Sequence, residues 1–313
     1  MYKICIIGIY FGKLPEYFPL WLKSCQYNET IDFLMITDQE IKEKPDNVKI
    51  KNMSFDEFKN LVQSKFEFKI ALNAPYKICD FKPAFGVICE EYLKEYQFWG
   101  HCDFDMIFGD LRGFLTQSLL NSYDKILPLG HLSLYSNNID NNNRFKLPGS
   151  NVGDYKTVFS TDRSFAFDET RGVLQIYKKN KLSVYEKRIF ADISSIYKRF
   201  RLALNDMNYK YQIFCFENGK VYREYIENGS LKKDEFIYIH IKKPKNLKIN
   251  LSGKSYCSYF ITNSGFYDKK FNTEINDIKQ YNNYRGYLYE LYEKERSKLT
   301  NRLNRILVKL RVN

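Results

Sequence analysis

The first 130 residues alternate between short apolar runs and segments in which apolar residues recur with helical spacing. The apolar runs, each expected to be a strand, are 3–10, 31–37, 47–53, 98–102 and 125–129. The segments with helical spacing are 16–27, 54–66, 82–96 and 110–123. The second of these opens with Ser54-Phe55-Asp56-Glu57, a capping box. This alternation predicts an α/β fold with a mainly parallel central sheet and with ligand sites at the carboxyl ends of the strands.

After Gly130 the pattern changes. Residues 136–150 are polar and rich in Asn, which predicts either a mobile loop beside the site or an ordinary surface insertion. From Tyr211 the chain has the character of β-hairpins, with turn signals at Asn218-Gly219 and Asn228-Gly229. We therefore expect one domain over 1–250, with halves 1–130 and 131–250. A connecting segment over 251–280 and a helical tail over 281–313 would follow it.

The tail has its own charge pattern. It holds eight Lys and Arg residues against three Glu. On a helical wheel one stripe is formed by Leu299, Leu303, Ile306, Leu307 and Leu310, and a neighbouring basic stripe by Lys298, Arg302, Arg305 and Lys309. This pattern is typical of an interfacial helix attracted to anionic lipid. The alternative is a solvated helix whose leucine face packs on the domain or on another subunit.

Composition widens the set of partners to consider. The net charge of +12 makes nucleic acid, anionic lipid and phosphorylated ligands candidates. Aromatic residues make up 17% of the chain, which suits stacking on sugar rings or simply reflects an AT-rich genome. The seven cysteines include no Cys-x-x-Cys pair, which favours reduced thiols over disulfides or a zinc site. Residues 4–11 lack a cleavage-site pattern and no apolar run reaches about 18 residues, so we expect a cytoplasmic protein.

The most informative motif is Asp103-Phe104-Asp105, which follows the strand expected over 98–102. In an extended segment residues i and i+2 point the same way, so both carboxylates can converge where the strand ends. Such a pair suits Mg²⁺ or Mn²⁺ and leaves room for the diphosphate of a nucleotide. The tripeptide is common by chance, but its place between a strand and a helix that starts at Asp110 supports a functional role. This is the arrangement of the DxD site in nucleotide-sugar-dependent glycosyltransferases.

Two sequence blocks, 75–86 and 99–111, resemble the DUF6625-type bacterial glycosyltransferase candidates, which are typically encoded among capsule and surface-polysaccharide genes. The resemblance covers the chain to about Pro244 and leaves the tail outside. It implies a GT-A fold, which is Rossmann-like with a mostly parallel central sheet, here with a C-terminal β-hairpin region and a helical tail. In this fold 1–130 would be the nucleotide-sugar-binding half and 131–250 the acceptor-side half.

The resemblance also implies metal ligands. The first Asp of the motif commonly contacts ribose or metal and the second binds the metal, which assigns these roles to Asp103 and Asp105. In the related glycogenin and galactosyltransferase-like families a histidine followed by Lys-Pro supplies a third ligand, which points to His240 before Lys243-Pro244. The glycine that those families carry in between is absent here, and a purely structural histidine is the alternative. Lys243 would contact the donor phosphates, or be solvated.

The block before the motif is expected to reach across the donor. Lys77 and Lys82 would neutralise its diphosphate and Asp80 would hold sugar hydroxyls, the alternative being an ordinary helix start at Pro83.

The ends of the first two strands are expected to hold the nucleoside. Tyr10 or Phe11 could stack on uracil, although packing in the core is as plausible, and Asp38 lies where the ribose would sit.

On the acceptor side, Asp168 is the first candidate for a base that deprotonates the acceptor hydroxyl and Glu169 the second. A helix-cap or surface role is the alternative for both. His131 would contact the acceptor or the donor sugar.

These features predict a Mn²⁺- or Mg²⁺-dependent glycosyltransferase that uses a nucleotide-sugar, with UDP favoured, and a saccharide or lipid-linked acceptor. Retention or inversion stays open. A metal-dependent nucleotidyltransferase could use the same carboxylates, but no Gly-rich basic loop lies near the N-terminus. A nucleic-acid-binding protein would explain the charge, but no binding motif is present. We therefore expect no nucleic-acid partner, and an anionic membrane surface as the partner of residues 281–313.

Overall fold

The structure is a computed structural model that describes residues 1–311, apart from 196, 198, 205–207, 243–246, 254, 271–272 and 282–283. For residues 284, 297–298 and 301–311 it describes the backbone alone.

A seven-stranded sheet forms the centre of the first half, in the order β3-β2-β1-β4-β7-β6-β8. Its parallel part consists of β1 (Ile4–Tyr10), β2 (Ile31–Thr37), β3 (Val48–Asn52) and β4 (Phe98–Cys102). β7 (Leu132–Ser136) runs antiparallel to β4 and to β6 (Lys125–Leu129), and β8 (Val184–Tyr185) pairs with β6 in parallel. The predicted fold class is confirmed: this is a Rossmann-like α/β fold with a mostly parallel central sheet.

Two hydrophobic clusters cover the two faces of this sheet, because successive side chains of a strand point to opposite faces. Ile4 and Ile6 of β1 belong to one cluster with α1 (Phe18–Gln26), and Cys5 and Ile7 belong to the other with α2 (Phe55–Gln63). The capping box of α2 forms as predicted, since Ser54 accepts from the Glu57 backbone and Glu57 accepts from the Ser54 backbone.

Two predicted helices are broken into shorter pieces. The region 75–96 contains η1 (Pro75–Lys77), α3 (Ile78–Phe81), η2 (Lys82–Ala84), α4 (Phe85–Ile88) and α5 (Glu90–Leu93). Pro83 lacks the N–H that would continue α3 past Lys82, and Cys89, at φ −102° and ψ 16°, leaves the helical conformation between α4 and α5. The region 110–123 splits into α6 (Leu111–Phe114) and α7 (Gln117–Ser122), because Thr116 caps a new helix by accepting from the Leu119 backbone.

The Asn-rich stretch 136–150, expected to be either a mobile loop beside the site or an ordinary surface insertion, contains two short helices and does not line the pocket. It contains α8 (Ile139–Asn143) and η3 (Arg144–Lys146). Asn141 is buried, and its side-chain amide donates to the backbone oxygens of Asp124 and Ser136. These hydrogen bonds fix the stretch to the residue before β6 and to the last residue of β7. α9 (Tyr155–Phe159) and α10 (Val173–Lys179) follow it.

A second sheet of six strands contains the hairpin region. Its strands, in spatial order, are β12 (Ser230–Phe236), β11 (Lys220–Glu227), β10 (Gln212–Glu217), β15 (Ser258–Ile261), β16 (Gly265–Asp268) and β14 (Lys248–Asn250). Both predicted turns form, with φ of 45° and 85° at Asn218-Gly219 and of 51° and 77° at Asn228-Gly229. Residues 251–280, expected to be a connector, instead supply β15, β16 and α11 (Ile275–Tyr281) to this part of the molecule.

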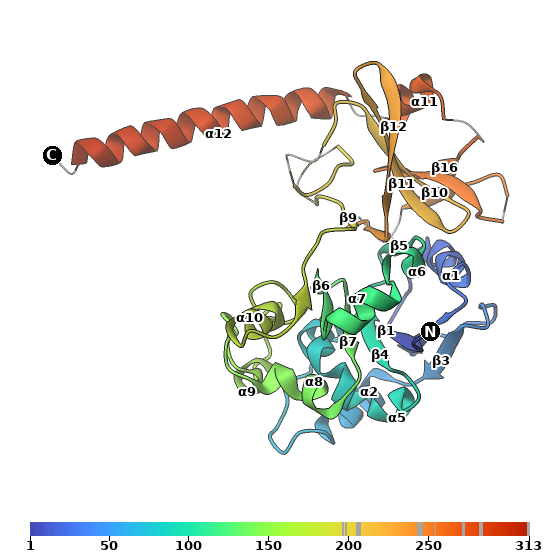
Figure 1. The fold of residues 1–313 in the computed structure, drawn as a ribbon, viewed down its shortest axis with the longest axis vertical. Coiled ribbons are helices and arrows are strands. Elements are labelled where there is room, and N and C mark those ends of the chain that lie inside the picture. The colour runs from blue at the N-terminus through green and yellow to red at the C-terminus, as the bar shows by residue number, and fades with distance from the viewer. Residues whose placement is uncertain are drawn as a thin grey trace.

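A third sheet of three short strands lies between the two larger ones (Figure 1). β13 (Tyr238–His240) is its centre, with β5 (Met106–Phe108) antiparallel on one side and β9 (Ala191–Asp192) parallel on the other. The chain passes from the second sheet to the third at Ile237, which lies between the end of β12 at Phe236 and the start of β13 at Tyr238.

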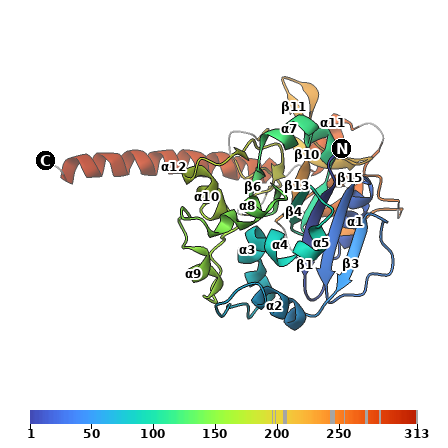
Figure 2. The ribbon, with the colours of Figure 1, turned by 60° about the horizontal axis from the view of Figure 1, so that its bottom comes forward.

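The chain ends in a long helix, α12 (Tyr284–Arg311), which projects away from the rest of the chain (Figures 1 and 2). Near its start Glu290 is buried against Arg199 and Arg201, at 3.1 and 2.9 Å. The predicted tail is therefore anchored at one end by buried charges. In the part of the chain that the structure describes, no helix combines the length and the apolar character needed to cross a membrane.

Candidate functional site

A pocket of about 500 Å³ opens at the carboxyl ends of β1 and β4. Of the residues predicted from the sequence, it is lined by Tyr10, Phe11, Lys82, Asp103, Asp105, Asp168 and Glu169. It is also lined by Tyr17, Tyr76 and Cys79, which were not proposed as site residues. The pocket therefore brings together residues from both predicted halves, at the sheet edge where ligands of parallel α/β folds bind.

Asp103 and Asp105 meet His240 at this edge. Ligand atoms of the three side chains lie within 4.8 Å of one another, and His240 Nε2 is 3.3 Å from Asp105 Oδ1. The register of the third sheet explains the meeting, because His240 pairs with Met106, the residue after Asp105, and the Ile241 N–H donates to the Asp105 carbonyl. Burial disfavours a charged ring, but Asp105 and Asp192 outweigh it and raise the pKa of His240 to about 9.

Lys82 bridges the two sides of the pocket. Its Nζ lies 2.7 Å from Asp103 Oδ1 and 3.1 Å from Asp168 Oδ2, and it donates to the carbonyl of Gly130 at 3.0 Å. Burial opposes the charged form, but the two carboxylates outweigh it, so the pKa of Lys82 is raised. Lys82 therefore stays an ammonium ion and links the Asp103 side of the pocket to the Asp168 side.

Asp168 is buried and unusually basic. Burial raises the pKa of the Asp168 carboxyl to about 7; the Lys82 ammonium opposes this shift, while Glu169 adds to it. Its Oδ1 has no hydrogen-bond partner among the described residues. Gly130 packs against this carboxylate so closely that an added Cβ would lie 2.3 Å from Oδ2. A buried carboxylate with a raised pKa that lines a pocket is a candidate proton acceptor for a bound hydroxyl.

Lys77 and Asp80 are placed differently from Lys82. They form a buried pair at 2.7 Å, and neither lines the pocket. Lys77 also donates to the carbonyls of Val158 and Arg163, while Asp80 accepts from the backbone N–H of Phe165 and Phe167. The pair thus ties η1 and α3 to the segment that leads to Asp168, which is a positioning role. Direct contact with a donor stays a prediction.

At the end of β1, Tyr10 and Phe11 line the pocket, and Phe11 also packs edge-on against Phe55. Asp38 is exposed and accepts from the backbone N–H of Gly12 at 3.0 Å, which ties the ends of β1 and β2 together. Asp38 does not line the pocket, and its contact with ribose stays a prediction.

His131 is buried beside His240 instead of lining the pocket. The two rings stack with 4.1 Å between their centroids and 28° between their planes. His131 Nδ1 is 2.9 Å from the Tyr238 hydroxyl, and burial, with the nearby His240, holds the pKa of His131 well below its usual range. The ring is therefore neutral, and contact with a sugar stays a prediction.

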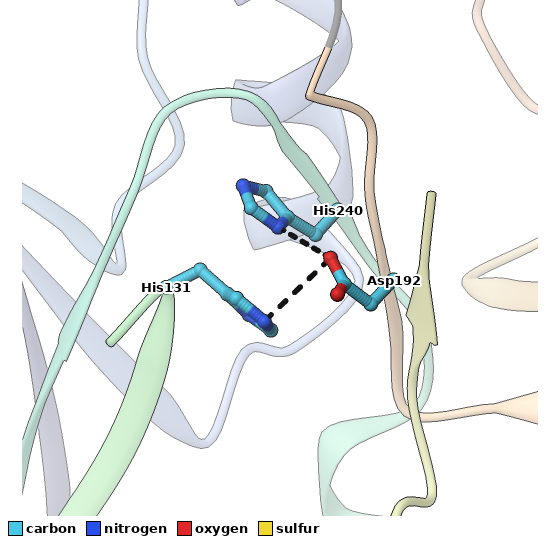
Figure 3. A group of neighbouring side chains, drawn as sticks. All are labelled: His131, Asp192 and His240. Carbon is cyan, nitrogen blue, oxygen red and sulfur yellow. Dashed lines mark hydrogen bonds and ion pairs between the residues drawn. The ribbon is translucent and has the colours of Figure 1, made fainter. Parts of the chain in front are cut away.

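Asp192 was missed in the sequence. Its Oδ1 lies 3.0 Å from His240 Nδ1 and 3.9 Å from His131 Nε2 (Figure 3). Lys242 reaches the same carboxylate at 2.9 Å. No local signal marks Asp192, because it sits in a short apolar stretch and β9 is too short to show a period. Lys243 falls outside the residues that the structure describes.

The side chains at the motif fit a divalent cation. Two carboxylates and one imidazole nitrogen are oxygen and nitrogen donors of the kind that Mn²⁺ accepts. The geometry also fits, because the His240 ring faces the Asp105 carboxylate and both groups would bind the same ion. Asp103, Asp105 and His240 would hold the cation, with positions left for oxygen atoms of a ligand.

Fold and site together define a Rossmann-like α/β protein with a carboxylate- and histidine-containing site at the carboxyl ends of its parallel strands. The chain belongs to DUF6625, a family of unknown function, whose sequence pattern matches residues 6–270. No curated protein matches it. Among solved structures it is similar to a crystal structure of the galactosyltransferase LgtC in complex with donor and acceptor sugar analogs, with a TM-score of 0.36, 10% identity, and coverage of 60% of this chain and 75% of that chain. The family match ends before α12 begins.

Proposed function

We propose that this protein is a metal-dependent glycosyltransferase that moves a sugar from a UDP-sugar to a hydroxyl of a saccharide acceptor. The observation that carries the proposal is the meeting of Asp103 and Asp105, which line a pocket of about 500 Å³, with His240 from a strand far along the chain. A carboxylate pair alone is common, but a buried histidine brought to it by strand pairing indicates a built metal centre.

Each pocket residue then has a role. A divalent cation held by Asp103, Asp105 and His240 supplies charge that stabilises the leaving nucleoside diphosphate. Tyr10 and Phe11 line the end of the pocket that would take the base, and Lys82 keeps Asp103 oriented toward the centre. Lys243, from its place shortly after His240 in the sequence, would contact the phosphates.

Asp168 and Glu169 line the same pocket and are our candidates for the acceptor side. Asp168 would accept the proton of the attacking hydroxyl, and its pKa of about 7 suits this role near neutral pH. Glu169 would orient the sugar.

The acceptor that fits the tail is lipid-linked, at the inner face of the cell membrane, as in the synthesis of surface or capsular polysaccharide. Five large apolar side chains of α12 are exposed: Leu288, Tyr289, Leu291, Tyr292 and Leu299. Together with the basic sequence of the tail, they suit an anionic bilayer.

The central test is the release of UDP. Purified protein is incubated with a panel of UDP-sugars, with Mn²⁺ or with EDTA, and free UDP is measured. We expect Mn²⁺-dependent release, abolished by Asp105→Asn and retained by Asp234→Asn, a carboxylate of the second sheet that pairs with Arg223. Salt-sensitive binding of oligonucleotides without any turnover would contradict the proposal.

Membrane contact is tested separately by flotation with vesicles. We expect binding to vesicles containing phosphatidylglycerol and not to pure phosphatidylcholine, lost at high salt and in a variant with Arg302, Arg305 and Lys309 changed to Gln. Equal binding of that variant, or a stable dimer that dissociates when the tail is changed, would contradict membrane contact and favour packing on another subunit.

A further inference from the structure

We propose that Asp192 is a positioning residue that fixes the His240 ring so that Nε2 faces the cation. The inference rests on the proposed metal centre and concerns a side chain outside the pocket. Its basis is the third sheet, in which His240 pairs directly with Asp192 on β9 and with Met106 on β5. Three strands from separate parts of the chain thus place Met106, His240 and Asp192 in one row, and Asp105 directly precedes Met106.

The contacts define the orientation of the ring. His240 Nδ1 lies 3.0 Å from Asp192 Oδ1, and Nε2 lies 3.3 Å from Asp105 Oδ1 on the other side (Figure 3 shows the Asp192 contact). An ionised carboxylate only accepts hydrogen bonds, so Nδ1 carries the proton toward Asp192. When a cation occupies the centre, the other nitrogen then presents its lone pair to it. Carboxylate–histidine–metal arrangements of this kind orient the ligand ring and strengthen its donor nitrogen.

Asp192 is itself held in place. It is buried, and Lys242 Nζ lies 2.9 Å from its carboxylate. Lys242 has a φ of 50°, in the left-handed region, so the chain turns sharply directly after β13 and brings this ammonium back over Asp192. The carboxylate therefore has a cation on one side and the ring of His240 on the other, and cannot rotate away without losing both.

The same residues could in principle hold a cation among His131, Asp192 and His240, whose ligand atoms also lie within 4.8 Å of one another. The rings argue against it. A metal lies close to the plane of each imidazole that binds it, and rings stacked at 4.1 Å and 28° do not point their nitrogens at one nearby position. Binding there would also disrupt the hydrogen bond between His240 Nδ1 and Asp192 Oδ1.

The test measures Mn²⁺ binding directly, by electron paramagnetic resonance titration of the full chain without any substrate. We expect Asp192→Ala to weaken Mn²⁺ binding about 10- to 100-fold, the range found for such outer residues. Asp192→Asn keeps an oxygen acceptor for Nδ1 and should weaken binding less. Asp234→Asn, a carboxylate ion-paired on another strand, is the matched control and should bind as the wild type does. Thermal unfolding in EDTA checks that each variant folds.

The outcomes separate this inference from the proposed function. Wild-type binding by Asp192→Ala, with binding lost in Asp105→Ala, would overturn the positioning role and leave the metal centre standing. Binding that is lost in His131→Ala but kept in Asp105→Ala would place the cation in the buried cluster and overturn the inference. A wild-type chain that binds no Mn²⁺ would contradict the metal centre and the inference together.

Discussion

At the scale of single residues, the site depends on charges that burial makes expensive and that neighbours compensate. Lys82 is the clearest case, since a buried ammonium is tolerated here only because Asp103 and Asp168 lie within about 3 Å of it. The compensation for Asp168 is incomplete: burial raises the pKa of its carboxyl to about 7 in spite of Lys82. Buried groups with displaced pKa values beside a pocket are typical of functional sites.

This displacement predicts a pH dependence. The hydrogen-bond-accepting form of Asp168 is the ionised one, whose fraction rises as pH increases through about 7. At saturating Mn²⁺ we expect transfer to increase about tenfold per pH unit below 7 and to level off above it. Asp168→Asn should lower the rate about 10²- to 10⁴-fold and remove this limb of the profile. An unchanged profile in that variant would assign the limb to another group.

At the scale of elements, the third sheet brings together the residues of the candidate metal site. Its strands are only two or three residues long, yet β5, β13 and β9 place Asp105, His240 and Asp192. Gly109 follows β5, and its N–H donates to the Ile237 carbonyl, which ties β5 to the start of β13. An added Cβ at Gly109 would meet backbone atoms at 2.7 to 3.2 Å, namely Phe236 O, Val221 N and Ile237 O.

Gly109→Ala therefore probes the sheet. Backbone atoms cannot move aside as a flexible side chain can, so we expect a loss of about 1–3 kcal/mol in the free energy of unfolding. Because β5 would shift relative to β13, Mn²⁺ affinity should fall as well. Gly253→Ala, where an added Cβ meets nothing within 4 Å, is the control and should change stability by less than about 0.5 kcal/mol. Urea denaturation gives both values, and equal stability of the two variants would contradict the close packing.

At the scale of the whole molecule, a buried acid near the start of α12, Glu290, joins this helix to the segment 199–201, and Arg199 also lies over the Tyr287 ring of the helix. Glu290 accepts from Arg199 and Arg201, and Arg199 also donates to the carbonyl of Tyr209. Removing one partner of a buried ion pair leaves an uncompensated charge, which costs far more than losing an exposed pair.

Glu290→Ala should accordingly lower the free energy of unfolding by about 3–5 kcal/mol. The control is Glu293→Ala, which removes a partly exposed pair with Arg296 on the same helix and should cost about 0–1 kcal/mol. Chemical denaturation of the two variants measures the difference. Similar midpoints for both would show that the start of α12 is not held through Glu290.

The sequence by itself determined the features that depend on neighbours along the chain. Apolar runs predicted β1, β2 and β6 to within a residue or two at their ends, and the Asn-Gly pairs predicted both hairpin turns, because turn geometry requires positive φ at those positions. Asp103 and Asp105 could be proposed from their place at the end of a strand. Sequence spacing could not distinguish the two lysines of this block. Lys77 pairs with Asp80, and both bind the backbone of 158–167, whereas Lys82 lines the pocket.

Only the tertiary structure decided which distant residues meet. The contact of His240 with Asp105 depends on antiparallel pairing between strands separated by more than a hundred residues, and Asp192 joins them from a two-residue strand. Strands this short carry no periodic signal, and their pairing is set by the packing of the larger sheets on either side. Local chemistry thus marked where a metal site could lie, and long-range strand pairing determined which side chains complete it.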